Sequence, residues 1–262
     1  MPLLENLEEF KNVSPALQWA IFIIAVLIAL VAFFSTCVSI WLAIKYIRFN
    51  RRKNSIGKTG KEVARNLLDK NGLGHIKVSV WGSMLFGNSY SHYFKKVRLR
   101  RLTQNKKSIT SLAMASQKSA LAIMDKNGDV DMKSRIRLTP FIYFGPFAFI
   151  PLILIGVAID YLLFNLSGAA TVICASTGLL LYVISFILSI KVLKTEVKAQ
   201  KLAINILKKE NMATSEEIDM MQELYKLYNI QYVNDIIIAF LQMIYRVLML
   251  IAKIQQNSSN NK

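Results

Sequence analysis

The stretch that decides the fold class is residues 17–44, LQWAIFIIAVLIALVAFFSTCVSIWLAI. It contains no charged residue and exceeds the ~20 apolar residues that an α-helix needs to cross a bilayer. The whole chain is 53% hydrophobic and has a mean hydropathy of +0.36, which is typical of membrane proteins. We therefore predict a mainly α integral membrane protein with three or four transmembrane helices, at residues 17–44, 146–166, 169–190 and 232–252. Because Asp235 and Arg246 interrupt the last segment, that segment is predicted either to span the membrane or to lie at its interface.

Basic residues concentrate between the first two predicted spans. Residues 45–137 hold 22 Lys and Arg against 5 Asp and Glu, so this segment carries the entire formal net charge of +17. Lys and Arg beside membrane spans stay in the cytoplasm. This rule predicts a multi-pass protein with an extracytoplasmic N-terminus at residues 1–16, a basic cytoplasmic domain at 45–138 and cytoplasmic helices at 191–230. The acidic flank and the length of the first span favour a retained anchor over a cleaved signal peptide.

The positive charge predicts that the basic domain lies against the anionic cytoplasmic leaflet of the lipid bilayer. Each Lys or Arg near such a surface contributes ~1 kcal/mol to binding. Nucleic acid is not an expected partner, because no binding motif accompanies the charge and the aromatic residues do not form a stacking platform. The predicted lipid-facing cluster follows the first span and consists of Lys45, Arg48, Arg51, Arg52 and Lys53.

The basic segment also carries the pattern of a small folded domain. Apolar periodicity predicts two helices and two strands, in the order helix 58–71, strand 75–81, strand 96–102 and helix 108–125. Thr214 and Glu217 are spaced as a capping box, which predicts the start of a later helix. The polar residues 253–262 predict a disordered tail.

Two motifs in this segment resemble those of a known family. They read TGKEVAR at residues 59–65 and LDKNGL at residues 68–73. Together with the spacing of the elements that follow, they are similar to the bacterial membrane-bound neutral zinc metallopeptidases (YugP type), over about residues 55–250. The resemblance implies a small α+β, gluzincin-like cytoplasmic domain between the first and second spans, in a protein of the bacterial cell membrane.

The family pattern H-E-x-x-H falls on the second predicted helix, and this chain departs from it. The resemblance assigns the first His position to Gln117, the Glu position to Lys118 and the second His position to Leu121. In the family, residues at i and i+4 share a helix face and bind zinc, while the Glu activates a zinc-bound water. The third ligand position is Glu196, which is retained, and the Asp two residues later is Lys198. Because leucine has no lone pair and ammonium groups repel a dication, we expect no catalytic residue, no zinc and no other cofactor.

The charges that remain suggest two ion pairs. Glu196 is expected to face Lys118 and Lys198, and we predict a pair with Lys118; the alternative is a solvated carboxylate. Asp160 and Arg246 both fall inside predicted spans and are candidates for a second pair; the alternative is that each side chain reaches the interface separately. A remnant metal site using Glu196 and His92 is a further alternative, against the simpler interpretation of a surface histidine.

These observations leave three functions open. The first is a catalytically inactive relative of a membrane zinc peptidase, which binds membrane-protein segments or scaffolds a membrane complex, with membrane proteins or an active homologue as partners. The second is an active metallopeptidase with a rebuilt site. The third is a membrane module that binds anionic lipid through its basic domain.

Overall fold

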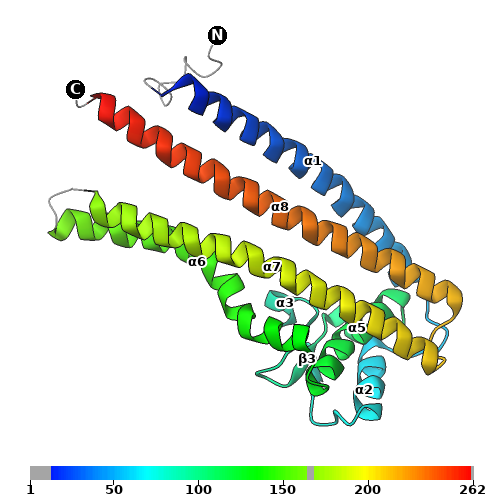
Figure 1. Cartoon of the computed structure of the whole chain (residues 1–262). Helices are drawn as coiled ribbons and strands as arrows, with labels where there is room; N and C mark the ends of the chain where they lie inside the picture. The colour runs from blue at the N-terminus through cyan, green and yellow to red at the C-terminus, as the bar shows by residue number, and fades with distance from the viewer. Residues whose placement is uncertain (1–12, 164–167, 261–262) are drawn as a thin grey trace. The chain divides into compact units, whose positions relative to one another are not determined.

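The computed structural model describes residues 13–163 and 168–260, so most of the predicted N-terminal segment 1–16 lies outside the described residues. The chain forms mainly helices and one small sheet (Figure 1). In chain order the elements are α1 (Pro15–Arg51), α2 (Gly60–Lys70), β1 (Lys77–Ser79), α3 (Ser83–Phe86), β2 (Ser89–Ser91), β3 (Lys96–Arg98), α4 (Arg101–Asn105), α5 (Ile109–Lys126), α6 (Val130–Leu163), α7 (Ala169–Lys209) and α8 (Ser215–Asn260).

These elements divide into two compact units. The apolar unit comprises residues 1–37, 141–187 and 231–262, and the mixed unit comprises residues 38–140 and 188–230. Each of the four long helices α1, α6, α7 and α8 contributes residues to both units. The mixed unit is therefore assembled from two separate stretches of the chain. In sequence, one precedes and the other follows the apolar residues 141–187 of α6 and α7.

The apolar unit contains the helical segments that could cross a membrane. Among the described residues, three helices are long and apolar enough by length and composition, namely Pro15–Arg51, Ala169–Lys209 and Ser215–Gln256. A shorter apolar segment, Ala148–Leu162, lies in α6. The segment predicted at 232–252 is thus part of a candidate spanning helix, and the apolar segment Ala148–Leu162 falls within the span predicted at 146–166.

Close helix contacts hold the apolar unit together. A Cβ atom added at Gly156 of α6 would lie 2.7 Å from the Cα atom of Thr171 in α7, so glycine lets these two backbones approach. Between α7 and α8, the rings of Phe186 and Phe240 stack with centroids 4.6 Å apart. Small residues and aromatic packing of this kind favour association of apolar helices.

The C-terminal end differs from the prediction of a disordered tail at 253–262. Helix α8 continues to Asn260, and the last two residues lie outside the described part. Neither Gly nor Pro interrupts this end of the helix. The amide of Ser14 at the start of α1 donates to Gln255, 3.2 Å away, and Ala252 is buried with Val13 and Ile21 of the N-terminal region. These contacts hold the helix as far as Gln255, inside the segment predicted to be disordered.

In the mixed unit a three-stranded sheet has the order β1-β3-β2, with β1 parallel and β2 antiparallel to the central β3. The strand predicted at 96–102 is shorter than expected, because α4 begins at Arg101. The segment between the two predicted strands contains two further elements, α3 and β2. The predicted capping box at Thr214 and Glu217 is confirmed by reciprocal hydrogen bonds of 2.9 and 3.3 Å.

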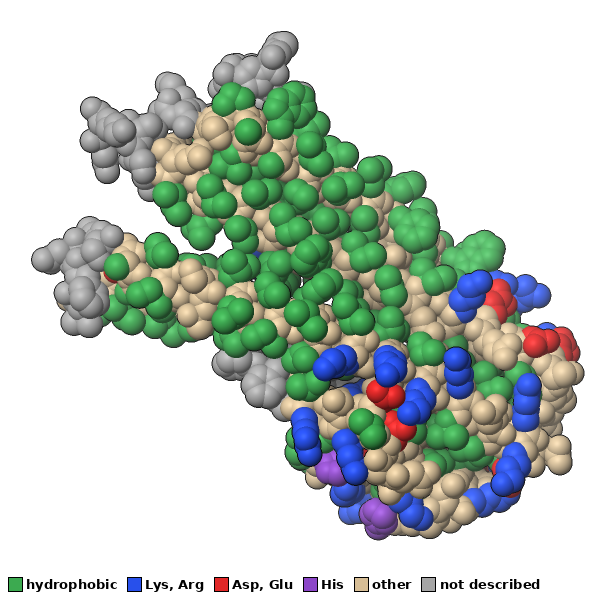
Figure 2. All heavy atoms as spheres, viewed as in Figure 1, with side chains coloured by type: hydrophobic (Ala, Val, Ile, Leu, Met, Phe, Trp, Pro, Cys, Tyr) green, Lys and Arg blue, Asp and Glu red, His purple; other side chains and the backbone are tan. Residues whose placement is uncertain are grey.

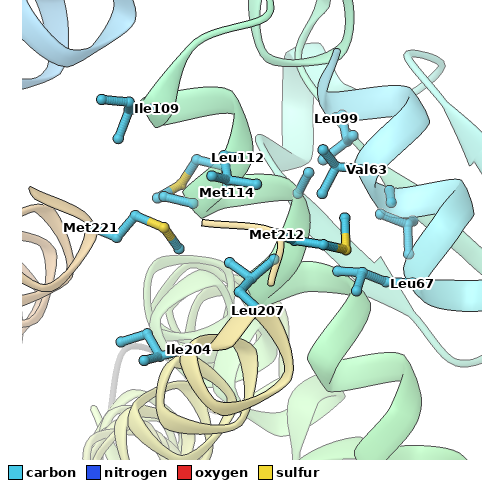
Figure 3. Close-up of a cluster of buried hydrophobic side chains, with 14 of the residues drawn as sticks. Val63, Leu67, Leu99, Ile109, Leu112, Met114, Ile204, Leu207, Met212 and Met221 are labelled. Atoms are coloured by element: carbon cyan, nitrogen blue, oxygen red, sulfur yellow. The ribbon is translucent and has the colours of Figure 1, made fainter. Parts of the chain in front are cut away.

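Helix α5 forms the centre of the mixed unit. All of its residues from Ile109 to Met124 are buried. Figure 3 shows side chains of α2, α5, α7 and α8 converging on one hydrophobic cluster, among them Val63, Leu67, Leu112, Leu207 and Met221. Most polar side chains on a helix that is buried on every side need hydrogen-bond partners, which makes the polar positions of α5 the natural place to look for a site.

The first family-like motif has a structural explanation. Thr59 and Glu62 form a capping box at the start of α2, with the Thr59 amide donating to the Glu62 carboxylate at 2.7 Å. A Cβ atom at Gly60 would lie only 2.1 Å from the carbonyl oxygen of Thr103, so no larger residue fits there without movement of the backbone. The second motif ends α2, where Gly72 adopts a left-handed φ of +65°.

Candidate functional site

The candidate site is built around the carboxylate of Glu196 on α7. The amide of Gln117 donates to Glu196 Oε2 at 2.8 Å, and the Lys118 Nζ atom lies 2.9 Å from the same oxygen. On the other side, Arg135 Nη2 lies 2.6 Å from Glu196 Oε1. One carboxylate from α7 is therefore held by two residues of α5 and one residue of α6. We refer to these four residues as the Glu196 cluster.

The charged groups of the Glu196 cluster are largely shielded from solvent. The side chains of Lys118, Arg135 and Glu196 are only 11%, 17% and 17% exposed. Burial by itself raises the pKa of Glu196, but the charges and hydrogen bonds of Lys118 and Arg135 outweigh that effect and lower the pKa to about 2. The carboxylate is therefore ionised at neutral pH, and removing one partner would leave a poorly solvated charge behind.

The pair predicted between Glu196 and Lys118 is present, whereas Lys198, which we expected to face the same carboxylate, lies outside the cluster. Its Nζ atom lies 2.5 Å from Asp129 and 3.3 Å from Asp131. These hydrogen bonds raise the pKa of Lys198. The second cation on Glu196 is instead Arg135, which no local sequence signal marked, because α6 brings it to the site from a position 61 residues earlier in the chain.

Leu121 occupies the position that the resemblance assigns to a second zinc ligand. Its side chain is completely buried in a small apolar cluster formed by α5, α6 and α7. The other buried members of this cluster are Ala120, Met124, Met132, Ala199 and Ala203. Apolar side chains thus occupy the surroundings of the position at which a metal-binding nitrogen would be needed.

His92 contacts Asp125 instead of Glu196. The His92 Nδ1 atom lies 2.6 Å from Asp125 Oδ2, and the hydroxyl of Tyr90 donates to the same oxygen at 2.6 Å. Burial and this bond to Asp125 raise the pKa of Tyr90. The remnant metal pair of Glu196 and His92 therefore has no support in the geometry, and the interaction of His92 ties β2 and the chain after it to α5.

The donor set around Glu196 does not fit zinc. Protein zinc sites use His nitrogen, Cys sulfur and carboxylate oxygen. Here a single carboxylate is surrounded by an amide, an ammonium and a guanidinium group. Within residues 13–163 and 168–260, no three His, Cys, Asp or Glu side chains gather in a way that could hold a metal ion.

Asp160 and Arg246, the two charged residues inside predicted spans, each contact other groups of the protein. The Asp160 carboxylate accepts hydrogen bonds from the backbone amides of Ala170 and Thr171 at 3.0 and 2.7 Å, at the start of α7. The guanidinium of Arg246 lies 5.9 Å from the ring centre of Phe149. The pair predicted between Asp160 and Arg246 stays a prediction.

The predicted lipid-facing cluster is partly engaged within the protein. Lys45 lies 2.6 Å from Glu223, and Arg52 lies 2.7 Å from Glu216, so two of its five cations are paired with carboxylates of α8. A membrane surface would have to compete with these internal anions for Lys45 and Arg52.

Comparison with known proteins shows to which family the chain belongs. No curated protein and no solved structure matches the chain. A family model with the description "Putative neutral zinc metallopeptidase" matches residues 21–251, which include α5, Glu196 and most of α1 and α8. Because this match covers far more than half of the 262 residues, the chain belongs to that zinc metallopeptidase family.

Proposed function

We propose that this chain is a catalytically inactive member of its peptidase family, a pseudopeptidase of the cell membrane. The observation that carries the proposal is the Glu196 cluster. The retained carboxylate is neutralised by Lys118 and Arg135, so it has no free charge to offer a metal ion. In place of a zinc-bound water, the centre of the domain holds an internal ion pair network.

A binding role fits what remains of the fold. Strand β2 (Ser89–Ser91) lies at an edge of the sheet, where an extended segment of another protein can add as a further strand. The bonds of Tyr90 and His92 to Asp125 fix this edge against α5. We therefore propose that the domain binds extended segments of membrane proteins, or scaffolds a complex that contains an active homologue, without cleaving them.

The test is the metal content and peptidase activity of the detergent-purified full chain. Elemental analysis should find less than about a tenth of an equivalent of zinc in the wild type, because its buried charges neutralise each other. Glu196→Ala should contain as little, because it lacks the carboxylate altogether. Incubation with unfolded membrane-protein substrates should leave these substrates intact in the presence of added zinc. Near-stoichiometric zinc that disappears in Glu196→Ala would instead establish a rebuilt hydrolytic site.

A second candidate function is binding of anionic lipid by the mixed unit. Around α3, three large apolar side chains are strongly exposed: Trp81 by 72%, Met84 by 96% and Leu85 by 85%. Residues 77–107 contain eight Lys and Arg and no Asp or Glu, and the Lys96 ammonium lies 4.9 Å from the Trp81 ring centre. Figure 2 shows Lys and Arg side chains gathered on the visible face of this unit. Exposed aromatic and basic residues together favour an anionic membrane interface.

Fluorescence of Trp81 tests this second function directly. In a Trp19→Phe, Trp41→Phe background the only tryptophan is Trp81. In vesicles containing anionic lipid we expect quenching by brominated lipid and protection from acrylamide. The matched control keeps only Trp19, in the first predicted span, and reports the quenching of a residue within the bilayer. Free access of acrylamide to Trp81, with no effect of brominated lipid, would exclude membrane contact of this surface.

A further inference from the structure

A cavity of about 260 Å³ lies within the apolar unit, between α6, α7 and α8. Its walls are mostly apolar and include Phe149 and Ile153 of α6 and Leu179 of α7. The α8 side contributes two cations, Arg246 and Lys253. An apolar cavity that carries two positive charges and lies among candidate spanning helices is unusual, because ionisable residues within a bilayer are costly and generally mark a functional site.

The two cations lie along one face of α8. Arg246 and Lys253 are seven residues apart, which is two helical turns or ~10 Å along the axis. No Asp or Glu follows Asp235 in the sequence. The contact that the structure gives the Arg246 guanidinium is the ring of Phe149, at 5.9 Å. An aromatic face attracts a cation but does not neutralise its charge.

Arg246 and Lys253 call for a negatively charged ligand, and their position along α8 suggests that this ligand is a lipid. Lys253 directly follows the apolar segment 232–252, which places it at the level of lipid headgroups if α8 spans the membrane. Arg246 then lies ~10 Å deeper, where a guanidinium typically reaches back towards phosphate. The predicted topology places this end of α8 at the extracytoplasmic leaflet, so the lipid would be one of that leaflet. Basic pockets between transmembrane helices on the cytoplasmic side bind anionic headgroups, and the same pairing of charges applies here.

We propose that this cavity binds one anionic phospholipid. Its phosphate is held between Arg246 and Lys253, and an acyl chain lies along Phe149, Ile153 and Leu179. The lipid neutralises the charges of α8 and fills the space between three helices, so it stabilises the packing of the apolar unit. The proposal is independent of the Glu196 cluster and of the peptidase ancestry of the mixed unit.

The experiment uses the full chain, purified in a neutral detergent and stripped of lipid. Native mass spectrometry and thermal unfolding are recorded with added phosphatidylglycerol, phosphatidylcholine or inorganic phosphate. We expect a one-lipid adduct and a raised Tm with phosphatidylglycerol, and neither with phosphatidylcholine or phosphate. Inorganic phosphate that raises the Tm to the same extent would show that an anion site without lipid selectivity is present, and would overturn the proposal.

Variants then locate the site. Arg246→Gln and Lys253→Gln are each expected to weaken phosphatidylglycerol binding about 5-fold, the usual contribution of one basic residue at an anionic surface. Arg246→Lys keeps the charge and should retain the adduct, which shows that a loss in Arg246→Gln does not come from misfolding. Lys226→Gln, an exposed residue on the same helix but outside the cavity, is the matched control. Equal binding by the wild type and the Arg246→Gln, Lys253→Gln double variant would refute the assignment.

Discussion

The Lys118 ammonium lies 2.9 Å from the carboxylate of Glu196, across the packed helices α5 and α7. The resemblance to the family assigns these two residues to a catalytic base and a zinc ligand, yet here they have opposite charges and bind each other. The interaction is a structural one, and its contribution to stability can be measured.

Glu196→Gln is expected to destabilise the protein by about 2–3 kcal/mol, because it leaves Lys118 and Arg135 without a counter-charge in a partly buried place. In a Lys118→Met background the same substitution should cost at least ~1 kcal/mol less, since one of the two cations is already gone. Denaturant unfolding of the four proteins in detergent measures this coupling. Strict additivity of the two substitutions would mean that the ion pair does not contribute to stability.

The stability of the protein should fall in acid because of Glu196. Its folded-state pKa of about 2 lies below the value of ~4.3 expected for an unfolded chain. A depressed pKa contributes stability that is complete above the unfolded value and is lost as pH falls through the folded value. Between pH ~4.5 and pH ~2 the wild type should therefore lose more stability than Glu196→Gln. Parallel pH profiles of the two proteins would contradict the predicted role of the carboxylate.

Leu121→Ala should destabilise the mixed unit by about 2–4 kcal/mol, because it removes a fully buried side chain and leaves a cavity between α5, α6 and α7. Leu102→Ala is the matched control, since Leu102 is 56% exposed and should change stability by less than about 0.5 kcal/mol. Thermal or denaturant unfolding distinguishes them. Similar effects of both substitutions would show that the packing around Leu121 is loose.

Restoring the family motif should not by itself restore zinc binding. In the variant Gln117→His, Lys118→Glu, Leu121→His, Arg135 still occupies Glu196 Oε1 and competes with the metal. Adding Arg135→Gln is expected to raise zinc affinity at least tenfold (about 1.4 kcal/mol), measured by competition with a chelator. Identical zinc affinities with and without Arg135→Gln would mean that this guanidinium does not obstruct the site.

Several features could be predicted from sequence because a local pattern determines them. The absence of charge in 17–44 predicts a long apolar helix, and α1 covers it. The spacing of Thr214 and Glu217 predicts the cap that the structure contains. Helix α5 begins one residue after its N-cap Ser108, as its apolar pattern indicates.

Other features depend on contacts between distant residues, which no local pattern encodes. Strand β2 is as short as β1 and β3, but its surroundings, NSYSH at residues 88–92, lack the alternating aliphatic residues that mark the other two. Arg135 reaches Glu196 only because α6 packs against α5 and α7, and Lys198 turns to Asp129 for the same reason. The contacts of Ala252 and Gln255 in α8 with Val13 and Ser14 likewise join opposite ends of the chain.

The composition of the Glu196 cluster limits what could open it. A guanidinium such as that of Arg135 remains charged under all physiological conditions, and Glu196 stays ionised down to a pH of about 2. No change of acidity inside a cell therefore separates them. Separating them requires another anion to take the place of Glu196 beside Lys118 and Arg135.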